Sequence, residues 1–268
     1  MIRVFRAEWR KLRRPTLFLG ALGAVIGVSG LVTSLLFLLI DSQSGNAERG
    51  ERITREILQL PSGVSIGFSN SAGLLGLVAL CVFAAQTAQE YTYGTLRNLL
   101  VRQPRRIQLL LGKYFSMVLF AFATVLVSAV TAIGLAFALS GRAKVSTTQW
   151  TTSDARSALL HTLINVLIST IGYGTVGMIL GLLLRSPISS ISIGVGWLLV
   201  VESIIAIAWK PSAKWMPGQL LSIVSSGGTP IGMSDALSYS QALTRVTIYL
   251  VLASCIIGWL FKKRDVSN

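Results

Sequence analysis

Residues 86–106, QTAQEYTYGTLRNLLVRQPRR, separate two long apolar segments at 66–88 and 109–139. A membrane-spanning helix needs about 20 predominantly apolar residues, and both flanking segments satisfy that length. The quoted stretch is too polar to cross a bilayer, so it connects two helices that can. Its four arginines, Arg97, Arg102, Arg105 and Arg106, exceed what a short connection needs, which indicates that this one is built for contact.

Apolar segments of similar length lie on both sides of this pair. Of the 268 residues, 52% are hydrophobic and 13% are charged, whereas about 25% of the residues of soluble domains are charged. The predicted spans are 17–40, 66–88, 109–139, 159–184, 188–208 and 243–261. We therefore predict an all-α, polytopic membrane protein with six spans in a single transmembrane domain over 1–268.

The distribution of positive charge predicts the orientation of these spans. An even number of spans leaves both termini on one side, and most of the 24 Lys and Arg fall in the segments expected on that side. Positive charge next to spans marks the cytoplasmic face. We expect a multi-pass protein of the cell (cytoplasmic) membrane with both termini cytoplasmic. The net charge of +14 then calls for no nucleic acid as a partner.

The first 15 residues, MIRVFRAEWRKLRRP, predict an interfacial amphipathic helix. Ile2, Phe5, Trp9 and Leu12 recur at helical spacing among basic residues, and Pro15 ends the pattern. Such a helix lies in the lipid headgroups. The alternative is a signal peptide, which is disfavoured because the apolar segment 17–40 exceeds the usual 7–15 residues and no small-residue cleavage site follows it.

The quoted stretch itself predicts a short amphipathic helix between spans. Tyr93, Leu96, Leu99 and Leu100 are expected on one face, whereas Glu90 and Arg97 lie elsewhere, and Gly94 and Pro104 interrupt the segment. Charge runs beside spans usually only set topology. Topology does not require this order of an acid, Gly-Thr and paired leucines, followed by Pro, Arg and Lys.

In that order the chain resembles the permease subunits of ABC-2 type transporters, bacterial relatives of the ABCG exporters. The motif positions are Glu90, Gly94, Thr95, Leu96, Leu99, Leu100, Pro104, Arg106 and Lys113. Pro104 is one residue closer to Arg106 than in the commonest version of the pattern. The basic N-terminus, the six spans and the long last outer segment extend the resemblance over essentially the whole chain.

The resemblance implies that 89–106 contains a coupling helix seated on a separate ATPase subunit, present in two copies, which holds ATP and Mg²⁺. It also implies a second permease copy or a homologous permease, and an amphiphilic cargo such as a drug, an antimicrobial peptide or a lipid. The chain itself has no G-x-x-x-x-G-K-[ST] loop. We therefore expect it to be no enzyme by itself and to bind no cofactor of its own.

Polar residues inside the spans are candidates for a translocation path, because ionisable groups in membranes usually face an interior or a hydrated cavity. Glu202 lies roughly 21 Å past Ile188 along a helix, in the outer half of its span. We predict that it lines an outer vestibule or pairs with a cation such as Arg245; a local hydrogen bond is the alternative. Weaker candidates are Asn70, Asn165, Ser169, Thr170 and Tyr173.

Two further segments leave alternatives open. Gly172, Gly174, Gly177 and Gly181 permit close helix packing, either within the chain or between copies. The segment 209–242 is either a re-entrant hairpin or a surface loop with the aromatic anchors Trp209 and Trp215.

Other functions are less compatible with the residues. Cys81 and Cys255 fall inside spans and His161 is the only histidine, so we expect no metal site. A membrane enzyme such as a lipid transferase needs convergent acid and base groups, and the acids here are scattered. The remaining alternative is a non-transporting scaffold or sensor that docks a cytoplasmic partner through 89–106.

Overall fold

The computed structural model describes residues 2–40, 53–102, 105–228 and 237–263, and these residues contain helices and no strands. The elements are α1 (Ile2–Leu12), α2 (Pro15–Leu38), α3 (Arg55–Gln59), α4 (Gly63–Thr92), α5 (Thr95–Arg102), α6 (Arg106–Ser140), η2 (Thr148–Thr151), α7 (Ser153–Leu184), α8 (Pro187–Val195), η3 (Gly196–Val201), α9 (Glu202–Ala208), η4 (Lys210–Lys214), α10 (Pro217–Ser225) and α11 (Tyr239–Lys263). Within the described residues, six helices are long and apolar enough to cross a membrane, which confirms the all-α, six-span prediction.

The ends of these helices follow from local sequence. Pro15 begins α2 at the first helical position, where its missing N–H costs nothing. The helix α7 begins before the predicted residue 159, because the Thr152 side chain accepts a hydrogen bond from Ala155 N and Asp154 lies in the first turn. The helix α4 continues past the predicted residue 88 to Thr92. Residues 41–52, which lie between the first two predicted spans, and the tail 264–268 lie outside the described residues.

The central pair of helices, α4 and α7, packs through glycines. A Cβ added at Gly177 would lie 2.3 Å from the carbonyl oxygen of Leu80, and one at Gly181 would lie 2.9 Å from that of Ala84. At Gly174 it would meet the Phe83 ring at 2.7 Å. These glycines therefore bring two backbones together inside one chain.

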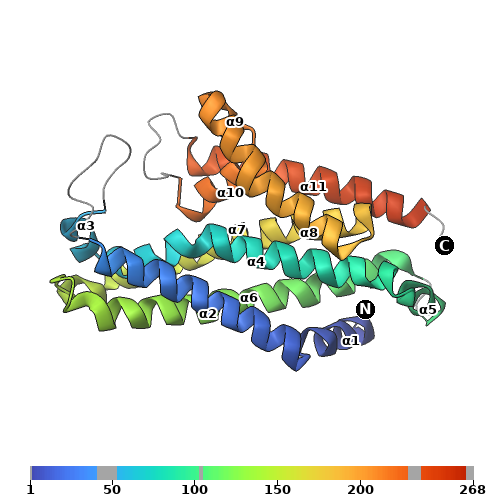
Figure 1. Ribbon diagram of the computed structural model, residues 1–268, viewed down its shortest axis with the longest axis horizontal. Coiled ribbons are helices and arrows are strands. Elements are labelled where there is room, and N and C mark those ends of the chain that lie inside the picture. The colour runs from blue at the N-terminus through green and yellow to red at the C-terminus, as the bar shows by residue number, and fades with distance from the viewer. Residues whose placement is uncertain (1, 41–52, 103–104, 229–236, 264–268) are drawn as a thin grey trace.

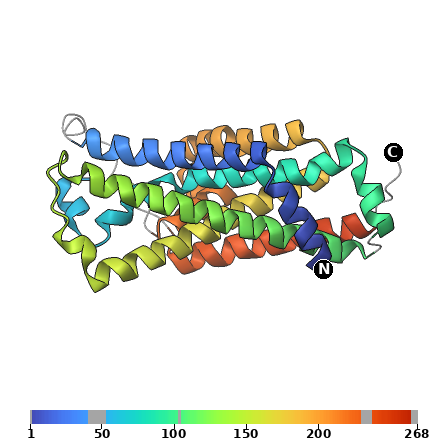
Figure 2. The ribbon, with the colours of Figure 1, turned by 90° about the horizontal axis from the view of Figure 1, so that it is seen from below.

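The remaining helices surround this pair (Figure 1). The helices α2 and α6 pack with α4, whereas α8, α9, α10 and α11 lie together on the other side of the bundle. The helix α1 leaves α2 at an angle and crosses α6 (Figure 2), where Ser116 Oγ donates to Phe5 O at 3.1 Å. The helices α1 and α5 and the last turns of α11 share one end of the bundle, which we call the terminal end.

The segment 209–242 contains a short helix inside the bundle. The nine-residue α10 is too short to cross a membrane, and its Leu220 and Leu221 are fully buried. It packs against α7 and α11, and Trp209 and Trp215 remain exposed. Protein contacts of this kind are what permits a non-spanning segment at membrane depth.

Candidate functional site: a charged junction beside a short helix

The helix α5 is a separate element at the terminal end. The helix α4 stops at Thr92, and Gly94 adopts a φ of +64°, a left-handed conformation that turns the chain into α5. Leu96 is buried against the bundle and Leu99 packs beside it. Tyr93, in contrast, follows the last residue of α4 and is 74% exposed, so it lies outside the short helix on which it was predicted to share a face with the leucines. Tyr93 and the exposed Val101 leave apolar surface uncovered beside α5.

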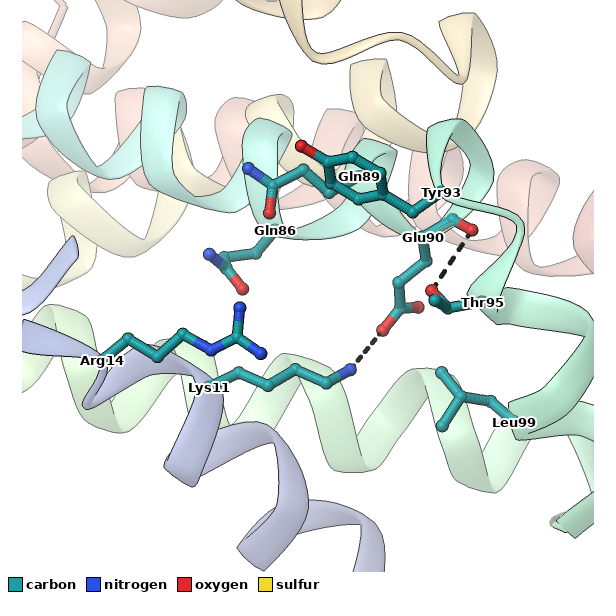
Figure 3. Close-up of a pocket in the computed structure, with 8 residues that line it drawn as sticks. All are labelled: Lys11, Arg14, Gln86, Gln89, Glu90, Tyr93, Thr95 and Leu99. Atoms are coloured by element: carbon teal, nitrogen blue, oxygen red, sulfur yellow. Dashed lines mark hydrogen bonds and ion pairs between the residues drawn. The ribbon is translucent and has the colours of Figure 1, made fainter. Parts of the chain in front are cut away.

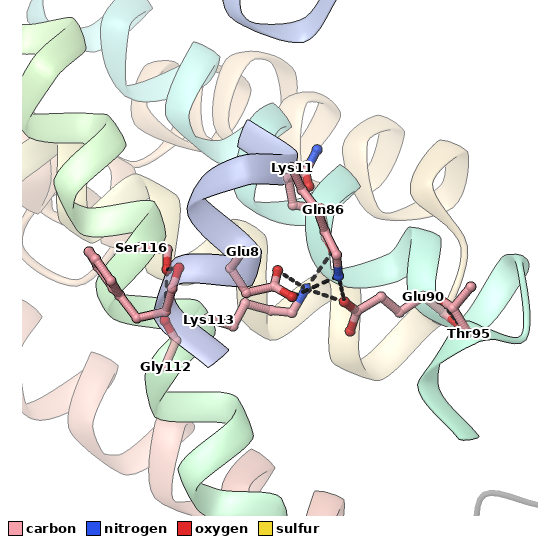
Figure 4. A network of polar contacts seen from close by, with 9 residues as sticks. Glu8, Lys11, Gln86, Glu90, Thr95, Gly112, Lys113 and Ser116 are labelled. Atoms are coloured by element: carbon pink, nitrogen blue, oxygen red, sulfur yellow. Dashed lines mark hydrogen bonds and ion pairs between the residues drawn. The ribbon is translucent and has the colours of Figure 1, made fainter. Parts of the chain in front are cut away.

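A buried ionic network joins α1, α4 and α6 next to this turn (Figure 4). Lys113 Nζ lies 2.8 Å from Glu90 Oε1 and 3.0 Å from Glu8 Oε2, and it also donates to Gln86 O at 3.0 Å. Lys11 Nζ lies 2.7 Å from both Glu8 Oε1 and Glu90 Oε1. The Lys113 side chain is only 3% exposed. The motif acid and the motif lysine, which belong to different spans, are thus a direct ion pair.

The network contains two acids and two lysines, and the opposite charges keep Glu8 and Lys11 ionised. Burial by itself raises the pKa of Glu8, but the neighbouring Lys113 and Lys11 outweigh burial and leave the pKa of Glu8 below its ordinary value. Burial lowers the pKa of Lys11, but Glu90 and Glu8 outweigh it and leave the pKa of Lys11 raised. Glu8 and Lys11 are therefore each held in the charged form by neighbours of opposite charge, and removing one partner would leave the other charge buried and unpaired.

The motif arginine makes a further connection at the same end. Arg106 Nη1 donates to the carbonyl oxygens of Phe261 and Lys262, both at 3.3 Å, in the last turn of α11. A cation there also complements the negative end of the helix dipole. Arg185, after α7, stacks over the Tyr91 ring at 5.4 Å from its centroid. Contacts around the 86–106 stretch therefore reach α1, α6, α11 and the end of α7.

Some predicted coupling residues receive no structural description. Pro104 lies outside the described residues, and the side chains of Arg97 and Leu100 are not described. Thr95 Oγ1 makes a long contact of 3.5 Å with Glu90 O. Sequence reasoning missed Glu8 and Lys11, because the N-terminal segment was interpreted only as a lipid-facing helix. The single acid in that basic segment was the available signal.

Several of the residues predicted to line a translocation path lie around α10. The Glu202 side chain is fully buried; its Oε1 accepts from Gly218 N at 3.1 Å and Trp197 Nε1 at 3.2 Å, and its Oε2 accepts from Gln219 N at 3.0 Å. Arg245 donates instead to Lys214 O at 2.6 Å and stacks on Trp215. The predicted Glu202–Arg245 pair is therefore not formed, because the free N–H groups at the start of α10 occupy the carboxylate.

The weaker path candidates divide into three kinds. Ser169 Oγ donates to Leu221 O at 3.0 Å and Tyr173 Oη donates to Gly218 O at 3.1 Å, so both hold α10 against α7. Thr170 bonds within its own helix, to Val166 O. Asn165 is half-buried and Asn70 is exposed. The structure brings Ser169, Tyr173 and Glu202 together around one short helix, and leaves Asn70 apart.

Comparison with known proteins identifies the family. The chain belongs to the family described as "Protein of unknown function (DUF2705)", which matches residues 59–267. It is also similar to a protein of Bacillus subtilis (strain 168) described as "Uncharacterized protein YhcI". The two are 25% identical over 214 residues, which cover 75% of this chain and 67% of the relative. The family match over residues 59–267 includes α4, α5 and α6, which carry the motif.

Proposed function

We propose that the chain is the membrane-spanning permease subunit of an ATP-binding cassette exporter of the ABC-2 type. In this proposal α5 is the coupling helix, a separate ATPase subunit in two copies binds ATP and Mg²⁺, and a second permease completes the translocation path. The cargo is amphiphilic, which suits a path between apolar helices. The terminal end faces the cytoplasm, in keeping with its concentration of Lys and Arg.

The observation that carries this proposal is the Glu90–Lys113 ion pair of 2.8 Å. These two motif residues bracket α5 from the preceding and the following span. The pair links the end of α4 to the start of α6, on either side of α5. Lys11 and Glu8 extend this network to α1. A push on α5 would then reach several spans as one rigid unit.

The proposed mechanism is alternating access driven by the ATPases. Two ATPase subunits that close on ATP would displace α5, and the displacement would bias the bundle between inward-open and outward-open arrangements. At the opposite side of the proposed path, Glu202, Ser169 and Tyr173 hold α10 by hydrogen bonds. Rearrangement of α10 would open that end.

The first test is co-purification with candidate ATPase subunits in nanodiscs. The Glu90→Ala, Gly94→Pro double variant disrupts both the ion pair and the left-handed turn, and should lose the ATPase. The Tyr93→Ala, Val101→Ala variant removes only exposed side chains beside α5 and leaves the network intact. It should also weaken binding, because those side chains are available for contact. Glu56→Ala, an exposed acid on α3, is the matched control and should bind as the wild type does.

Four outcomes distinguish the functions. Loss of the ATPase from both α5 variants, with their folding preserved, supports the coupling helix. Substrate-stimulated ATP hydrolysis by the wild-type complex supports transport. A complex that binds a cytoplasmic partner through 89–106 but never couples it to ATP hydrolysis would favour the scaffold or sensor instead. If no ATPase binds any variant, the exporter proposal fails.

A further inference from the structure

A cavity of about 340 Å³ lies at the terminal end, between the α1–α2 junction, the last turns of α4, and α5 (Figure 3). Its volume is in the range of small-molecule sites, which begins near 300 Å³. Lys11 and Arg14 reach it from one side, and Gln86, Gln89 and Glu90 line it from α4. Most of the lining residues carry a polar group that can make a hydrogen bond to an occupant, whereas most of the lining surface itself is apolar.

Gln86 lacks a partner for its side chain. The residue is only 8% exposed and its backbone carbonyl accepts from Lys113, but its amide has no hydrogen bond to any described residue. Figure 3 shows this amide directed into the cavity, opposite Arg14. The Gln86 amide is open to the cavity, where it can donate and accept hydrogen bonds. Its hydrogen-bond partner therefore comes from outside the chain, as water or as a bound ligand.

The charge around the cavity selects an anion. Lys11 is neutralised by Glu8 and Glu90, as is Lys113. Arg14 has no acidic partner among the described residues, and its guanidinium points into the cavity (Figure 3). A guanidinium fork matches the oxygens of a phosphate. Glu90, on the same wall, can accept a hydrogen bond from a hydroxyl beside that phosphate.

The position of the cavity relative to the spans predicts that it lies at the depth of lipid headgroups. The apolar helix α2 begins at Pro15, immediately after Arg14, and the amphipathic α1 ends just before it. The junction between an interfacial helix and a span is where the headgroups are found. We propose that this cavity binds the phosphate headgroup of an anionic phospholipid. Arg14 holds the phosphate, Gln86 donates to a phosphate oxygen, and Glu90 accepts from a headgroup hydroxyl.

Occupancy of this site has a consequence for α5. Thr95 and Leu99 of α5 also line the cavity, so a bound headgroup contacts the helix that couples to the ATPase. This consequence rests on the proposed function, whereas the binding itself does not. A lipid in the cavity would fix α5 against α1 and α4.

The test is native mass spectrometry of the full chain in a maltoside detergent, titrated with phosphatidylglycerol. The variant is Arg14→Gln and its matched control is Arg13→Gln, which removes the same charge from the adjacent exposed residue that does not line the cavity. We expect affinity to fall about tenfold for Arg14→Gln and less than about twofold for Arg13→Gln. Gln86→Leu should weaken binding in the same direction. Thermal unfolding checks that each variant is folded.

Two parallel titrations identify the source of the phosphate. Phosphatidylcholine carries the same phosphodiester but has no free headgroup hydroxyl and no net negative charge, so it should bind more weakly than phosphatidylglycerol. Titration with glycerol 3-phosphate tests whether the cavity binds a soluble phosphate compound instead of a lipid. If that compound binds with the same dependence on Arg14 while phosphatidylglycerol does not, the phosphate site stands but the lipid assignment is overturned.

Equal weakening by Arg14→Gln and Arg13→Gln would overturn the site and leave only a diffuse basic surface. The proposal and the exporter function also fail separately. Lipid binding that depends on Arg14, in a chain that binds no ATPase, removes only the exporter. An ATPase complex without such binding removes only the lipid site.

Discussion

At the residue scale, Gly94 separates α4 from α5 by a left-handed turn. Its φ is +64°, and nothing lies within 4 Å of an added Cβ, so only the backbone conformation opposes substitution. Gly94→Ala should destabilise this turn by about 1–2 kcal/mol. Gly134→Ala, also with open space but inside α6, should be neutral or stabilising by up to about 1 kcal/mol. Thermal unfolding in detergent measures both, and equal effects would contradict the role given to the turn.

Glu202 is the other residue whose environment predicts a large effect. Its carboxylate accepts three hydrogen bonds, two of them from the first turns of α10. Glu202→Gln retains one acceptor oxygen but turns an N–H₂ group toward a donor, so we expect a loss of about 1–3 kcal/mol. Unfolding measurements check this loss, with the exposed Glu56→Gln as control. Unchanged stability and unchanged transport in Glu202→Gln would remove both its structural and its path role.

At the element scale, the ionic network docks α1 on α4 and α6, and this docking depends on pH. Glu8 has a lowered pKa in the folded chain, so its stabilisation is present above the ordinary carboxyl value near 4.5 and is lost as pH falls through the lowered value. Lys11 has a raised pKa, so its contribution is present below about 10.5 and is lost as pH rises through the raised value. Between these limits Glu8 and Lys11 are both charged and stay paired.

We therefore predict that Glu8→Gln lowers the unfolding temperature near neutral pH and removes part of the acid-dependent loss. The measurement is the unfolding temperature from pH 3 to 9 in detergent. Glu56→Gln should keep the wild-type profile. A Glu8→Gln profile parallel to that of the wild type, at every pH, would show that the network does not respond to protonation of Glu8.

The packing of α4 on α7 gives a second prediction for elements. A Cβ at Gly177 would overlap the Leu80 carbonyl, which is backbone and cannot rotate away. Gly177→Ala should force the helices apart and destabilise the bundle by about 1–3 kcal/mol. Gly73→Ala on α4 meets nothing within 4 Å and is the control. Thermal unfolding distinguishes them, and a neutral Gly177→Ala would contradict the close approach.

At the scale of the whole molecule, the terminal end carries most of the basic residues and should face the cytoplasm. A fluorescent protein fused after residue 268 should fluoresce in cells, and an alkaline phosphatase fused there should be inactive. The same reporters inserted between Lys144 and Thr148, at the opposite end, should give the reverse result. Active phosphatase at the C-terminus would invert the orientation and place α5 away from any cytoplasmic ATPase.

The sequence by itself determined the membrane class, the all-α fold, the six spans and the turn at Gly94. These features depend on local composition: a run of about 20 apolar residues has to be a helix in a bilayer, whatever it packs against. The position of the short helix after Gly94 followed from the same local signals. The prediction that Tyr93 shares a face of this short helix with the leucines was wrong, because α4 continues to Thr92 and α5 begins only at Thr95, which leaves Tyr93 between the two helices.

Only the tertiary structure decided which residues meet. The contact of Glu8 and Lys11 with Glu90 and Lys113 joins residues up to about a hundred positions apart, and no periodicity reports such a distance. The partners of Glu202 are likewise set by where α10 inserts, and the predicted cation Arg245 is not among them. Hydrogen bonds and ion pairs are decided by geometry within about 3 Å, whereas sequence patterns only report which face of a helix is apolar.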